Sequence, residues 1–347
     1  MTKSEYPENK IIGFFINQRA GLKRDINYKD IIKSAQRAFY ELNYEVIIFD
    51  EIYLDEVGEV DLLRYDSDIK EILKYSDTKK AELILCAVGG DGTFNLLVNR
   101  TIAHLIPGLF IKFAFWGIGT VNVFSLEFNL PNKIEGVLKL IQDNKVRSFQ
   151  LWDFEFINDS DEQKIWYCLM FSSIGIDAEA LENVNIKRKR QFGKKAIVIQ
   201  GFKDLVCTVL YDDRNKRKIK IHCFDEIIFA NWVVFSNISY YAGKFKLFKI
   251  SDPSDQLFEV IIQLESPGLF FLTGYLGFWI LMVISLLFRL KQVPLSILKS
   301  LRLFRTMQVE KIQIQSVHEI QLQIDGDAIG RCSELRIKPG PQIQILI

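Results

Sequence analysis

The stretch that decides the fold is LILCAVGGDGTFNLLVNR, residues 83–100. Residues 83–88 are apolar without interruption, which indicates a buried strand. From Phe94 onward the apolar positions suit the first turns of a helix. The residues between them form a strand-to-helix turn, where glycine lets bare backbone N–H groups approach a ligand. The glycines of this turn are Gly89, Gly90 and Gly92.

Such a turn ahead of a helix predicts a cradle for phosphate, because unpaired N–H donors and the positive end of the helix dipole meet there. Thr93 belongs to the same cradle. Asp91 alone would repel phosphate, so its presence predicts a magnesium ion that bridges carboxylate and phosphate oxygens. A glycine-rich turn in which Asp91 only caps the helix is the alternative that these residues leave open.

Strands and helices alternate around this turn over residues 10–150. Strands are expected at 10–17, 44–50, 81–88 and 110–117, and helices at 28–41, 59–75 and 93–105. This alternation predicts an α/β domain, a parallel sheet with helices on both faces. Ligands of such sheets bind at the carboxyl ends of the strands, so three loops are expected to share one nucleotide site. They are INQRAG (16–21), GGDGT (89–93) and GIGTVNVF (117–124).

The sequence changes character near residue 150, which divides the chain into domains 1–150 and 151–347. The second part is rich in aromatic and β-branched residues that alternate with polar ones, a pattern typical of antiparallel strands. We expect an antiparallel β-sandwich, interrupted by a helix at about 179–209.

Composition excludes several function classes. The chain has 347 residues, 44 basic and 43 acidic side chains and a net charge of +1, which argues against dedicated nucleic-acid binding. Its five cysteines are widely spaced and its three histidines are isolated, so zinc sites and catalytic triads have little support. The charged N-terminal residues do not form a signal peptide, and the expected location is cytoplasmic.

Several short motifs occur in a recognisable order. They are NQRAG (17–21), GGDGT (89–93) with Asn95 and Asn99, GTVN (119–122), GIDAE (175–179), KRKRQFGKKA (187–196), FSNISYYAGKFKL (235–247), SDPSDQLFEVI (251–261) and IDGD (324–327). In this order they resemble the diacylglycerol kinase catalytic-domain family of lipid kinases, whose relatives include sphingosine and ceramide kinases.

The resemblance implies an ATP- and Mg²⁺-dependent kinase that phosphorylates a hydroxyl of a membrane lipid, most simply diacylglycerol. ATP would lie in a cleft between a NAD-kinase-like nucleotide domain and the β domain that holds the lipid. Asp327, at the position of the acid in a late DGE motif, would act as general base. Asp91 would be the second catalytic residue and would assist through the metal. A segment similar to a DGL motif would hold a structural magnesium through Asp255 and Leu257. The implied nucleotide-binding residues are Asn17, Gly89, Gly90, Gly92, Thr93, Asn95, Gly119, Thr120 and Asn122.

Some positions depart from the family pattern. Leu96 and Val123 replace acids near the nucleotide, Gln256 replaces a glycine, and Asp327 is one methylene shorter than the usual glutamate. These departures leave open a degenerate, nucleotide-binding membrane adaptor without turnover. NAD kinases share the GGDGT loop, and a sphingoid or ceramide kinase is a further alternative. A homodimer is also an open expectation.

Residues 269–288 form a stretch of 20 residues without a charge, which we name the charge-free segment. A helix of this length could cross a bilayer, but a single span would separate the glycine loop from Asp327. The segment is therefore expected to insert partway, or to pack on the protein and dock at a membrane surface; a buried core helix is the alternative. The basic run between 187 and 195 could contact anionic headgroups, although a solvated helix face is the commoner explanation for such a run.

Overall fold

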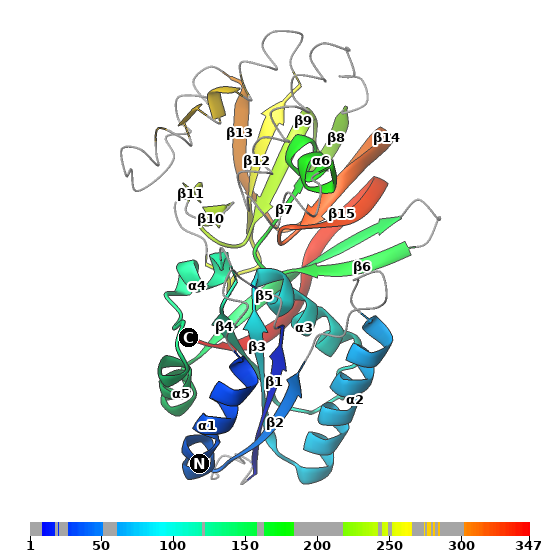
Figure 1. Ribbon diagram of the computed structural model, residues 1–347. Helices are drawn as coiled ribbons and strands as arrows, with labels where there is room; N and C mark the ends of the chain where they lie inside the picture. Colours follow the sequence, from blue (N-terminus) through cyan, green and yellow to red (C-terminus); the bar gives the residue numbers. More distant parts are fainter. Residues whose placement is uncertain are drawn as a thin grey trace, which may run out of the picture. The chain divides into compact units, whose positions relative to one another are not determined.

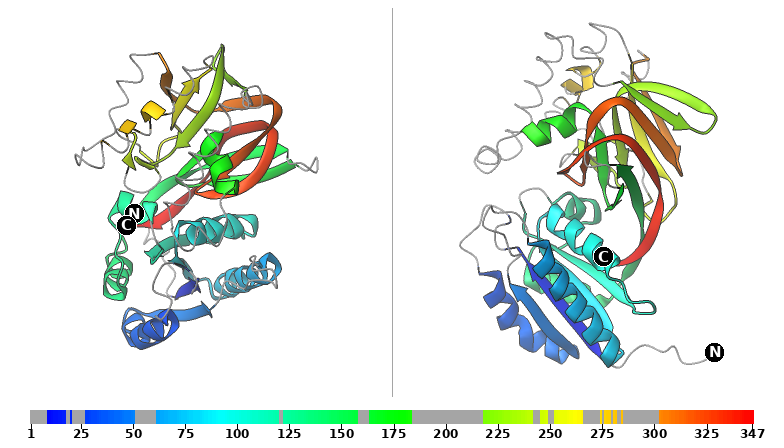
Figure 2. Two further views of the ribbon diagram at one scale, coloured as in Figure 1. Left: turned by 45° about the horizontal axis from the view of Figure 1, so that its top comes forward. Right: turned by 90° about the vertical axis from the view of Figure 1, so that its right-hand side faces the viewer.

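The computed structural model describes residues 9–17, 20, 27–50, 61–119, 122–157, 163–183, 218–241, 245–248, 252–265 and 302–347, with seven positions between 274 and 284. The chain divides into two compact units (Figures 1 and 2). Residues Met1–Phe149 and Gln342–Ile347 form the N-terminal unit, and Gln150–Pro341 form the β unit. The last six residues thus return to the N-terminal unit, which the division at residue 150 does not include.

The N-terminal unit is built on a parallel sheet in the order β4-β3-β1-β2. Its strands are β1 (Lys10–Ile16), β2 (Tyr44–Asp50), β3 (Glu82–Gly89) and β4 (Ile111–Gly117). Gln344 and Ile345, at the end of β15 (Asp327–Leu346), extend the sheet by pairing with β4. The strands lie where the apolar runs predict them, and β3 and β4 are buried from end to end because helices cover both faces.

Five helices accompany this sheet: α1 (Tyr28–Glu41), α2 (Leu62–Lys79), α3 (Asp91–Ala103), α4 (Val123–Phe128) and α5 (Ile134–Asp143). Helices α1 and α2 lie on opposite sides of the sheet (Figure 1). Successive residues of β1 face them: the Phe14 ring meets the Phe39 ring of α1 edge-on, whereas the Phe15 ring lies against Tyr65 of α2. Helix α2 begins later than predicted because Asp61 caps it by accepting the N–H of Arg64.

The β unit is antiparallel, as the alternating pattern predicts. Its strands are β5 (Val146–Ile157), β6 (Gln163–Cys168), β7 (Phe171–Ile174), β8 (Ile219–Cys223), β9 (Glu226–Ser236), β12 (Phe258–Leu264), β13 (Phe304–Val309), β14 (Ile312–Ile324) and most of β15, with the short pair β10 (Tyr240–Tyr241) and β11 (Phe245–Lys246). Strands β7 and β8 both pair with β9 and β14.

Apart from the separate pair β10–β11, the described strands of the β unit belong to one continuous hydrogen-bonded sheet, where the sequence predicts a sandwich of two sheets. The sheet curls, so that Trp152 of β5 packs against Phe258 of β12 with ring centroids 4.4 Å apart. Register shifts in the β9–β12 and β14–β15 pairs mark bulges, which increase local twist and let one sheet enclose its own core.

A short helix, α6 (Ile176–Asn183), follows β7 and begins before the position predicted for the 179–209 helix. Residues 184–217, including the basic run, lie outside the described residues. The described positions of the charge-free segment are helical. Among the described residues, no helix is long and apolar enough to cross a membrane.

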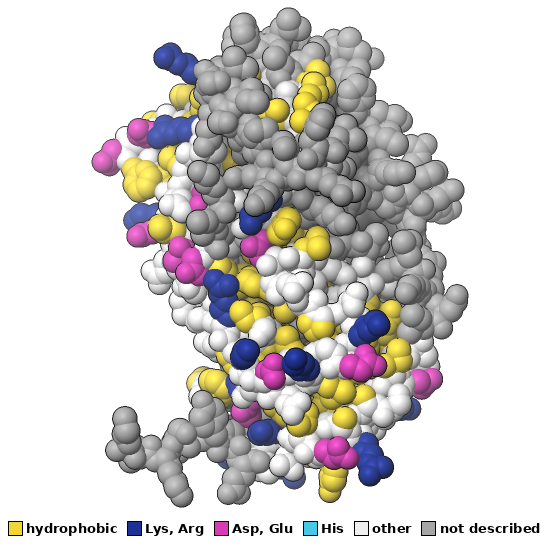
Figure 3. Space-filling model, turned by 90° about the vertical axis from the view of Figure 1, so that its left-hand side faces the viewer, with side chains coloured by type: hydrophobic (Ala, Val, Ile, Leu, Met, Phe, Trp, Pro, Cys, Tyr) yellow, Lys and Arg dark blue, Asp and Glu magenta, His cyan; other side chains and the backbone are white. Residues whose placement is uncertain are grey.

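The surface of the described residues has mixed charge. On the face shown in Figure 3, acidic and basic side chains are interspersed rather than gathered by sign. This distribution fits the near-neutral net charge of +1.

Candidate nucleotide-binding site

Backbone hydrogen bonds join two of the glycine loops at the carboxyl end of the parallel sheet. The N–H groups of Ile118 and Gly119 both donate to the carbonyl oxygen of Gly89, at 2.8 and 3.0 Å. From the β1 loop, the N–H of Asn17 donates to Val88, and its side-chain amide donates to the Thr93 hydroxyl at 3.1 Å. Three segments that are distant in the sequence therefore meet at one edge, as the alternating pattern predicts.

Two glycines allow these loops to touch. A Cβ on Gly119 would lie 2.6 Å from the Cα of Gly90, a distance that real Cβ atoms do not show. Gly90 itself has ordinary φ of −97°, and a Cβ there would meet its nearest neighbour at 3.7 Å. Gly119 is thus required by packing, whereas Gly90 leaves open space beside bare backbone.

Helix α3 starts at this edge without a side-chain cap. Gly90 is its N-cap residue, in an extended conformation, and the first helical bond runs from Phe94 N–H to the Gly90 carbonyl. The first turn accordingly offers backbone N–H donors at the positive end of the helix dipole, which suits an anion such as phosphate.

Asp91 does not cap its own helix but binds the backbone of the next loop. One carboxylate oxygen accepts the Val123 N–H at 2.7 Å and the other accepts the Phe124 N–H at 3.1 Å. The carboxylate thereby caps α4 and ties the GGDGT loop to the GTVN loop. Capping was the alternative reading of this residue, although the capped helix is α4 and not α3. No group of three or more His, Cys, Asp or Glu side chains that could hold a metal is found among the described residues, and the magnesium predicted at Asp91 stays a prediction.

The GTVN loop is held partly by its own asparagine. Asn122 adopts a left-handed φ of 47° and donates its amide to the Gly119 carbonyl at 3.0 Å. Its Oδ1 is buried and has no hydrogen-bond partner among the described residues, so it is an available acceptor beside the loop. Thr120, which the sequence places in the site, lies outside the described residues.

Asn95 is a predicted site residue whose described partner lies within its own helix. It is buried in α3, where its Oδ1 and carbonyl oxygen both accept from the Asn99 side chain. Leu96, one residue on, is half-buried, and Val123 is buried at the start of α4. A role of Asn95 in nucleotide binding stays a prediction.

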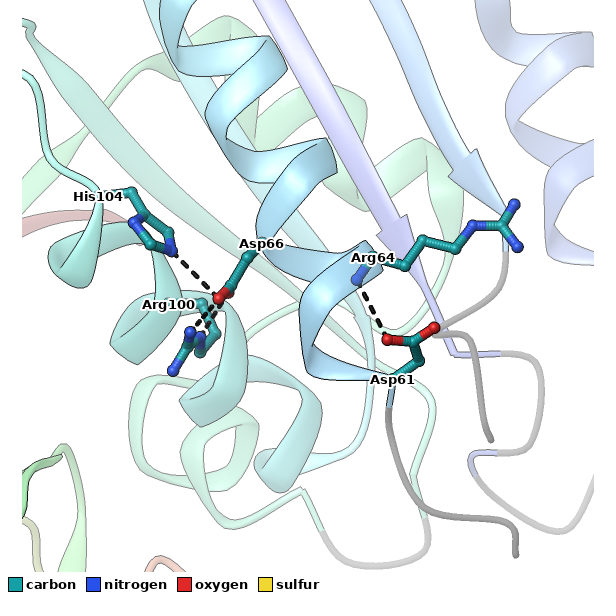
Figure 4. Close-up of polar contacts among 5 residues, drawn as sticks. All are labelled: Asp61, Arg64, Asp66, Arg100 and His104. Carbon is teal, nitrogen blue, oxygen red and sulfur yellow. Dashed lines mark hydrogen bonds and ion pairs between the residues drawn. The ribbon is translucent and has the colours of Figure 1, made fainter. Parts of the chain in front are cut away.

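The far end of α3 is anchored by an ionic contact (Figure 4). Asp66 of α2 accepts two hydrogen bonds from Arg100, one of them at 2.6 Å, and lies 3.3 Å from His104 Nε2. Burial alone would raise the pKa of the Asp66 carboxyl, but the hydrogen bonds from Arg100 and His104 outweigh burial and lower it. This tie fixes the axis of the helix whose other end faces the glycine loops.

The acids of the IDGD motif occupy two different environments in the β unit. Asp325 is 4% exposed and accepts the backbone N–H groups of three consecutive residues at 2.7 to 2.9 Å. These residues are Leu169, Met170 and Phe171. Burial nevertheless raises the pKa of the Asp325 carboxyl to about 6. Asp327 is exposed, at the first position of β15.

Asp177 of the GIDAE motif is a further acid in a polar cluster of the β unit. It accepts hydrogen bonds from Trp232 Nε1 at 2.7 Å, from the Tyr241 hydroxyl and from the Ala178 N–H. Burial raises the pKa of its carboxyl against the effect of these donors. The motif quoted for the resemblance contained this residue, but no local pattern predicts its partners because they come from β9 and β10.

The segment predicted to bind a structural magnesium is a compact turn. Asp255 accepts the N–H of Leu257 at 2.9 Å, and Asp252 accepts the N–H and hydroxyl of Ser254. Side-chain-to-backbone bonds of this kind close a turn without a metal. A magnesium at Asp255 and Leu257 therefore stays a prediction.

Comparison with known proteins places the N-terminal region. Residues 12–153 match the family model described as the diacylglycerol kinase catalytic domain. This part of the chain is similar to that family. The match contains all three loops whose contacts are described above, so the resemblance carried by the motifs is confirmed.

Curated relatives have the same family character. The chain is 29% identical over 135 residues to "Putative lipid kinase" of Staphylococcus carnosus, covering 37% of this chain and 38% of that protein. It is 31% identical over 157 residues to "Putative lipid kinase SH2167" of Staphylococcus haemolyticus, covering 43% of each. The matched region spans about two fifths of the length of these relatives.

Solved structures show that the fold is shared over nearly the whole chain. A structure titled as a putative diacylglycerol kinase from Bacillus anthracis matches with a TM-score of 0.63 at 16% identity, covering 99% of this chain and 98% of that one. A second Bacillus anthracis diacylglycerol kinase structure matches with a TM-score of 0.59 at 14% identity, covering the same shares. Both the α/β part and the antiparallel part thus share the fold of these structures.

Proposed function

We propose that this protein is an ATP-dependent lipid kinase that transfers the γ-phosphate to a hydroxyl of a membrane lipid, with diacylglycerol as the first acceptor to test. The observation that carries the proposal is the uncapped N-terminus of α3, which lies in backbone contact with a second glycine loop inside the matched catalytic domain. A lipid acceptor is supported by the names of the relatives.

In this proposal the backbone of the glycine loops binds the phosphates of ATP. Donors of the first turn of α3 face the phosphate oxygens, and Gly90 leaves room for them. Asn17 and Thr93 hold the neighbouring loop in place through their mutual hydrogen bond. Magnesium would enter with ATP, bound through phosphate oxygens, since the described residues gather no metal cluster of their own.

The proposed general base is Asp327. A primary hydroxyl is a poor nucleophile, and a carboxylate within hydrogen-bond reach removes its proton as the bond to phosphorus forms. Asp327 is exposed, as a group that meets substrate must be. The buried Asp325 instead holds the turn between β14 and β15 against residues 169–171. Asp177 and its donors are candidates for a contact to the polar part of the acceptor.

A nucleotide-binding adaptor without turnover is the second candidate function. It is favoured by Asp91, whose carboxylate oxygens both accept backbone N–H groups of the next loop. Leu96 and Val123, where the family has acids, point in the same direction.

The deciding experiment measures transfer of labelled γ-phosphate from ATP to diacylglycerol, a sphingoid base, ceramide and NAD, with the lipids in mixed micelles. Transfer to a single lipid establishes the kinase and its acceptor, and transfer to NAD overturns the lipid proposal. ATP binding without transfer to any acceptor supports the adaptor.

A further inference from the structure

The turn between β14 and β15 is a tight two-residue hairpin turn. Ile324 pairs with Asp327, and the two residues between them have left-handed φ angles, 51° at Asp325 and 91° at Gly326. An Asp-Gly pair with these angles is typical of a type I′ turn, which fixes the path of the residues on either side of it. The backbone of Asp327 is therefore set by the conformation of the turn.

A β-bulge separates this turn from the rest of the β14–β15 hairpin. The register of the pairing shifts between Leu322 and Gln323, opposite Gly330, whose φ of 142° is one that residues with a side chain rarely adopt. Between the bulge and the turn, the two strands are joined by only two residue pairs. Because so short a ladder gives the tip little support, the position of Asp327 depends on what else holds the tip.

Asp325 supplies this support by binding the connection between β6 and β7. Its Oδ2 accepts the Leu169 N–H at 2.9 Å, and its Oδ1 accepts the N–H groups of Met170 and Phe171 at 2.7 and 2.9 Å. The Asp325 N–H in turn donates to the Phe171 carbonyl oxygen at 2.8 Å. Hydrogen bonds to a carboxylate are stronger than those between neutral groups. We name the three N–H groups of residues 169–171 the amide clamp.

The amide clamp is held from its other side by the end of β9. The Asn237 N–H donates to the Met170 carbonyl oxygen at 2.8 Å, and the Asn237 side-chain amide donates to the Leu169 carbonyl oxygen at 3.3 Å. The Ser236 hydroxyl also donates to the Met170 carbonyl oxygen, at 3.3 Å. The clamp thus has partners besides the turn, and these partners fix the point at which the turn is held.

The turn does not need a buried carboxylate for its own conformation. Asparagine suits the first position of a type I′ turn as well as aspartate does. The Gly326 N–H is satisfied separately, by Gln323 Oε1 at 2.9 Å. Burying the Asp325 carboxylate costs free energy that only strong partners offset. The carboxylate therefore serves to hold the turn at one place rather than to form it.

We propose that Asp325 is a positioning residue, which binds the amide clamp and thereby fixes Asp327 in the geometry that removes the proton from the acceptor hydroxyl. The inference rests on the proposed function, because Asp325 acts through the base of the proposed phosphate transfer. In that transfer the hydroxyl oxygen bonds to the γ-phosphorus and the bond from this phosphorus to the bridging oxygen of ADP breaks. The hydroxyl proton passes to Asp327 and not to Asp325. A base misplaced by about 1 Å costs on the order of 10²-fold in rate.

The test is a double-mutant cycle on the full chain, with kcat for phosphate transfer to diacylglycerol in mixed micelles as the readout. The assay is run at pH 8, above the pKa of about 6 of the Asp325 carboxyl. In Asp325→Asn the remaining oxygen still accepts from Met170 and Phe171, but the amide nitrogen meets the Leu169 N–H. We expect kcat to fall about 30-fold and KM for ATP to stay within about twofold. In the Asp327→Ala background, the same substitution changes the residual rate by less than about twofold, because no base is left to position.

Three results overturn the proposal, and they have different meanings. An equal loss in both backgrounds assigns Asp325 a merely structural role, since a folding defect lowers every rate by the same factor. Full activity of Asp327→Ala beside an inactive Asp325→Asn assigns proton removal to Asp325 itself. A wild type that transfers no phosphate removes the proposed function together with the positioning role, whereas an active wild type with an additive cycle removes the positioning role alone.

A second readout does not depend on activity. Amide hydrogen exchange at Met170 and Phe171 becomes faster in Asp325→Asn and stays unchanged in Asp327→Ala, because only Asp325 binds the clamp. Unchanged exchange in Asp325→Asn overturns the proposal. Ser316→Ala is the matched control, since it removes a 2.9 Å hydrogen bond to the Lys218 carbonyl oxygen near the start of β14 and keeps kcat within about twofold.

Urea unfolding verifies that each variant folds. If Asp325→Asn does not fold, Gln323→Leu takes its place in the cycle, because it removes the acceptor of the Gly326 N–H and loosens the same turn. Its expected loss is about threefold to tenfold with Asp327 present and less than about twofold in Asp327→Ala. An equal loss in the two backgrounds contradicts the proposal here as well.

Discussion

The glycine-loop edge of the N-terminal unit and the buried acids of the β unit use their hydrogen-bonding groups in opposite ways. At the loop edge, bare backbone is left available, and the nearby side chains of Asp91 and Asn122 bind other backbone groups. In the β unit, carboxylates are enclosed and surrounded by donors, as at Asp325 and Asp177. The proposed phosphate site therefore depends on positions that lack a side chain. The protonation of a buried carboxylate depends instead on hydrogen-bond donors from segments distant in the sequence.

The sharpest test of this contrast is Asp327→Asn in the β unit. Loss of a general base lowers kcat by about 10²- to 10⁴-fold. Because Asp327 is exposed, the free energy of unfolding changes by less than about 0.5 kcal/mol. The measurement is kcat for lipid phosphorylation alongside urea unfolding. An active Asp327→Asn beside an inactive Asp325→Asn transfers the role to the buried acid, whose pKa of about 6 suits a base near neutral pH.

The second test uses the raised pKa of Asp325 directly. Its pKa is about 6 in the folded chain against the usual 3.8, so the folded state binds the proton more tightly. The contribution of this group to stability is therefore fully present below pH 4, falls as the pH rises to about 6, and is constant above. The loss is on the order of 3 kcal/mol. Urea unfolding from pH 4 to 8 shows this slope in wild type and lacks it in Asp325→Asn.

The third test asks whether the loop edge depends on missing side chains. Gly119→Ala places a methyl group against the Gly90 backbone and forces the two loops apart, so kcat/KM for ATP falls by about 100-fold. Gly90→Ala has room for its methyl group and keeps its unfolding free energy, yet raises KM for ATP by about tenfold because the methyl occupies the phosphate approach. An unchanged KM in Gly90→Ala would place the phosphates elsewhere.

The same contrast explains what the sequence predicts well. Parallel strands, their order along the chain and the three converging loops follow from apolar runs that end in glycine or asparagine, which are local features. The glycine at position 119 has a steric reason, because a Cβ there would collide with the backbone of Gly90. The curled single sheet cannot be predicted from the sequence. Its β7 and β8 both pair with β9 and β14, and these pairings join segments that are far apart in the sequence.

Acids are harder to interpret for the same reason. Asp325 and Asp327 stand two residues apart in one motif, yet one is buried under three N–H donors and the other is exposed. Those donors belong to residues 169–171, more than 150 positions earlier. Asp177 likewise meets Trp232 and Tyr241 only through the fold. Sequence reasoning can find such acids but cannot assign their protonation.

The smallest expected effect belongs to Asp91, which lies in the glycine loop but binds in the manner of the buried acids. If its carboxylate serves to cap α4, Asp91→Asn retains an acceptor for the Val123 N–H and costs less than about 1 kcal/mol of stability, whereas Asp91→Ala costs about 1 to 2. The magnesium concentration for half-maximal transfer then stays unchanged in Asp91→Asn. If Asp91 is instead a metal ligand, Asp91→Asn raises the magnesium concentration for half-maximal transfer by about tenfold or more and leaves stability unchanged. Capping and metal binding therefore predict opposite pairs of results. A magnesium titration combined with urea unfolding shows whether the glycine loop works through its backbone alone or also depends on the charge of Asp91.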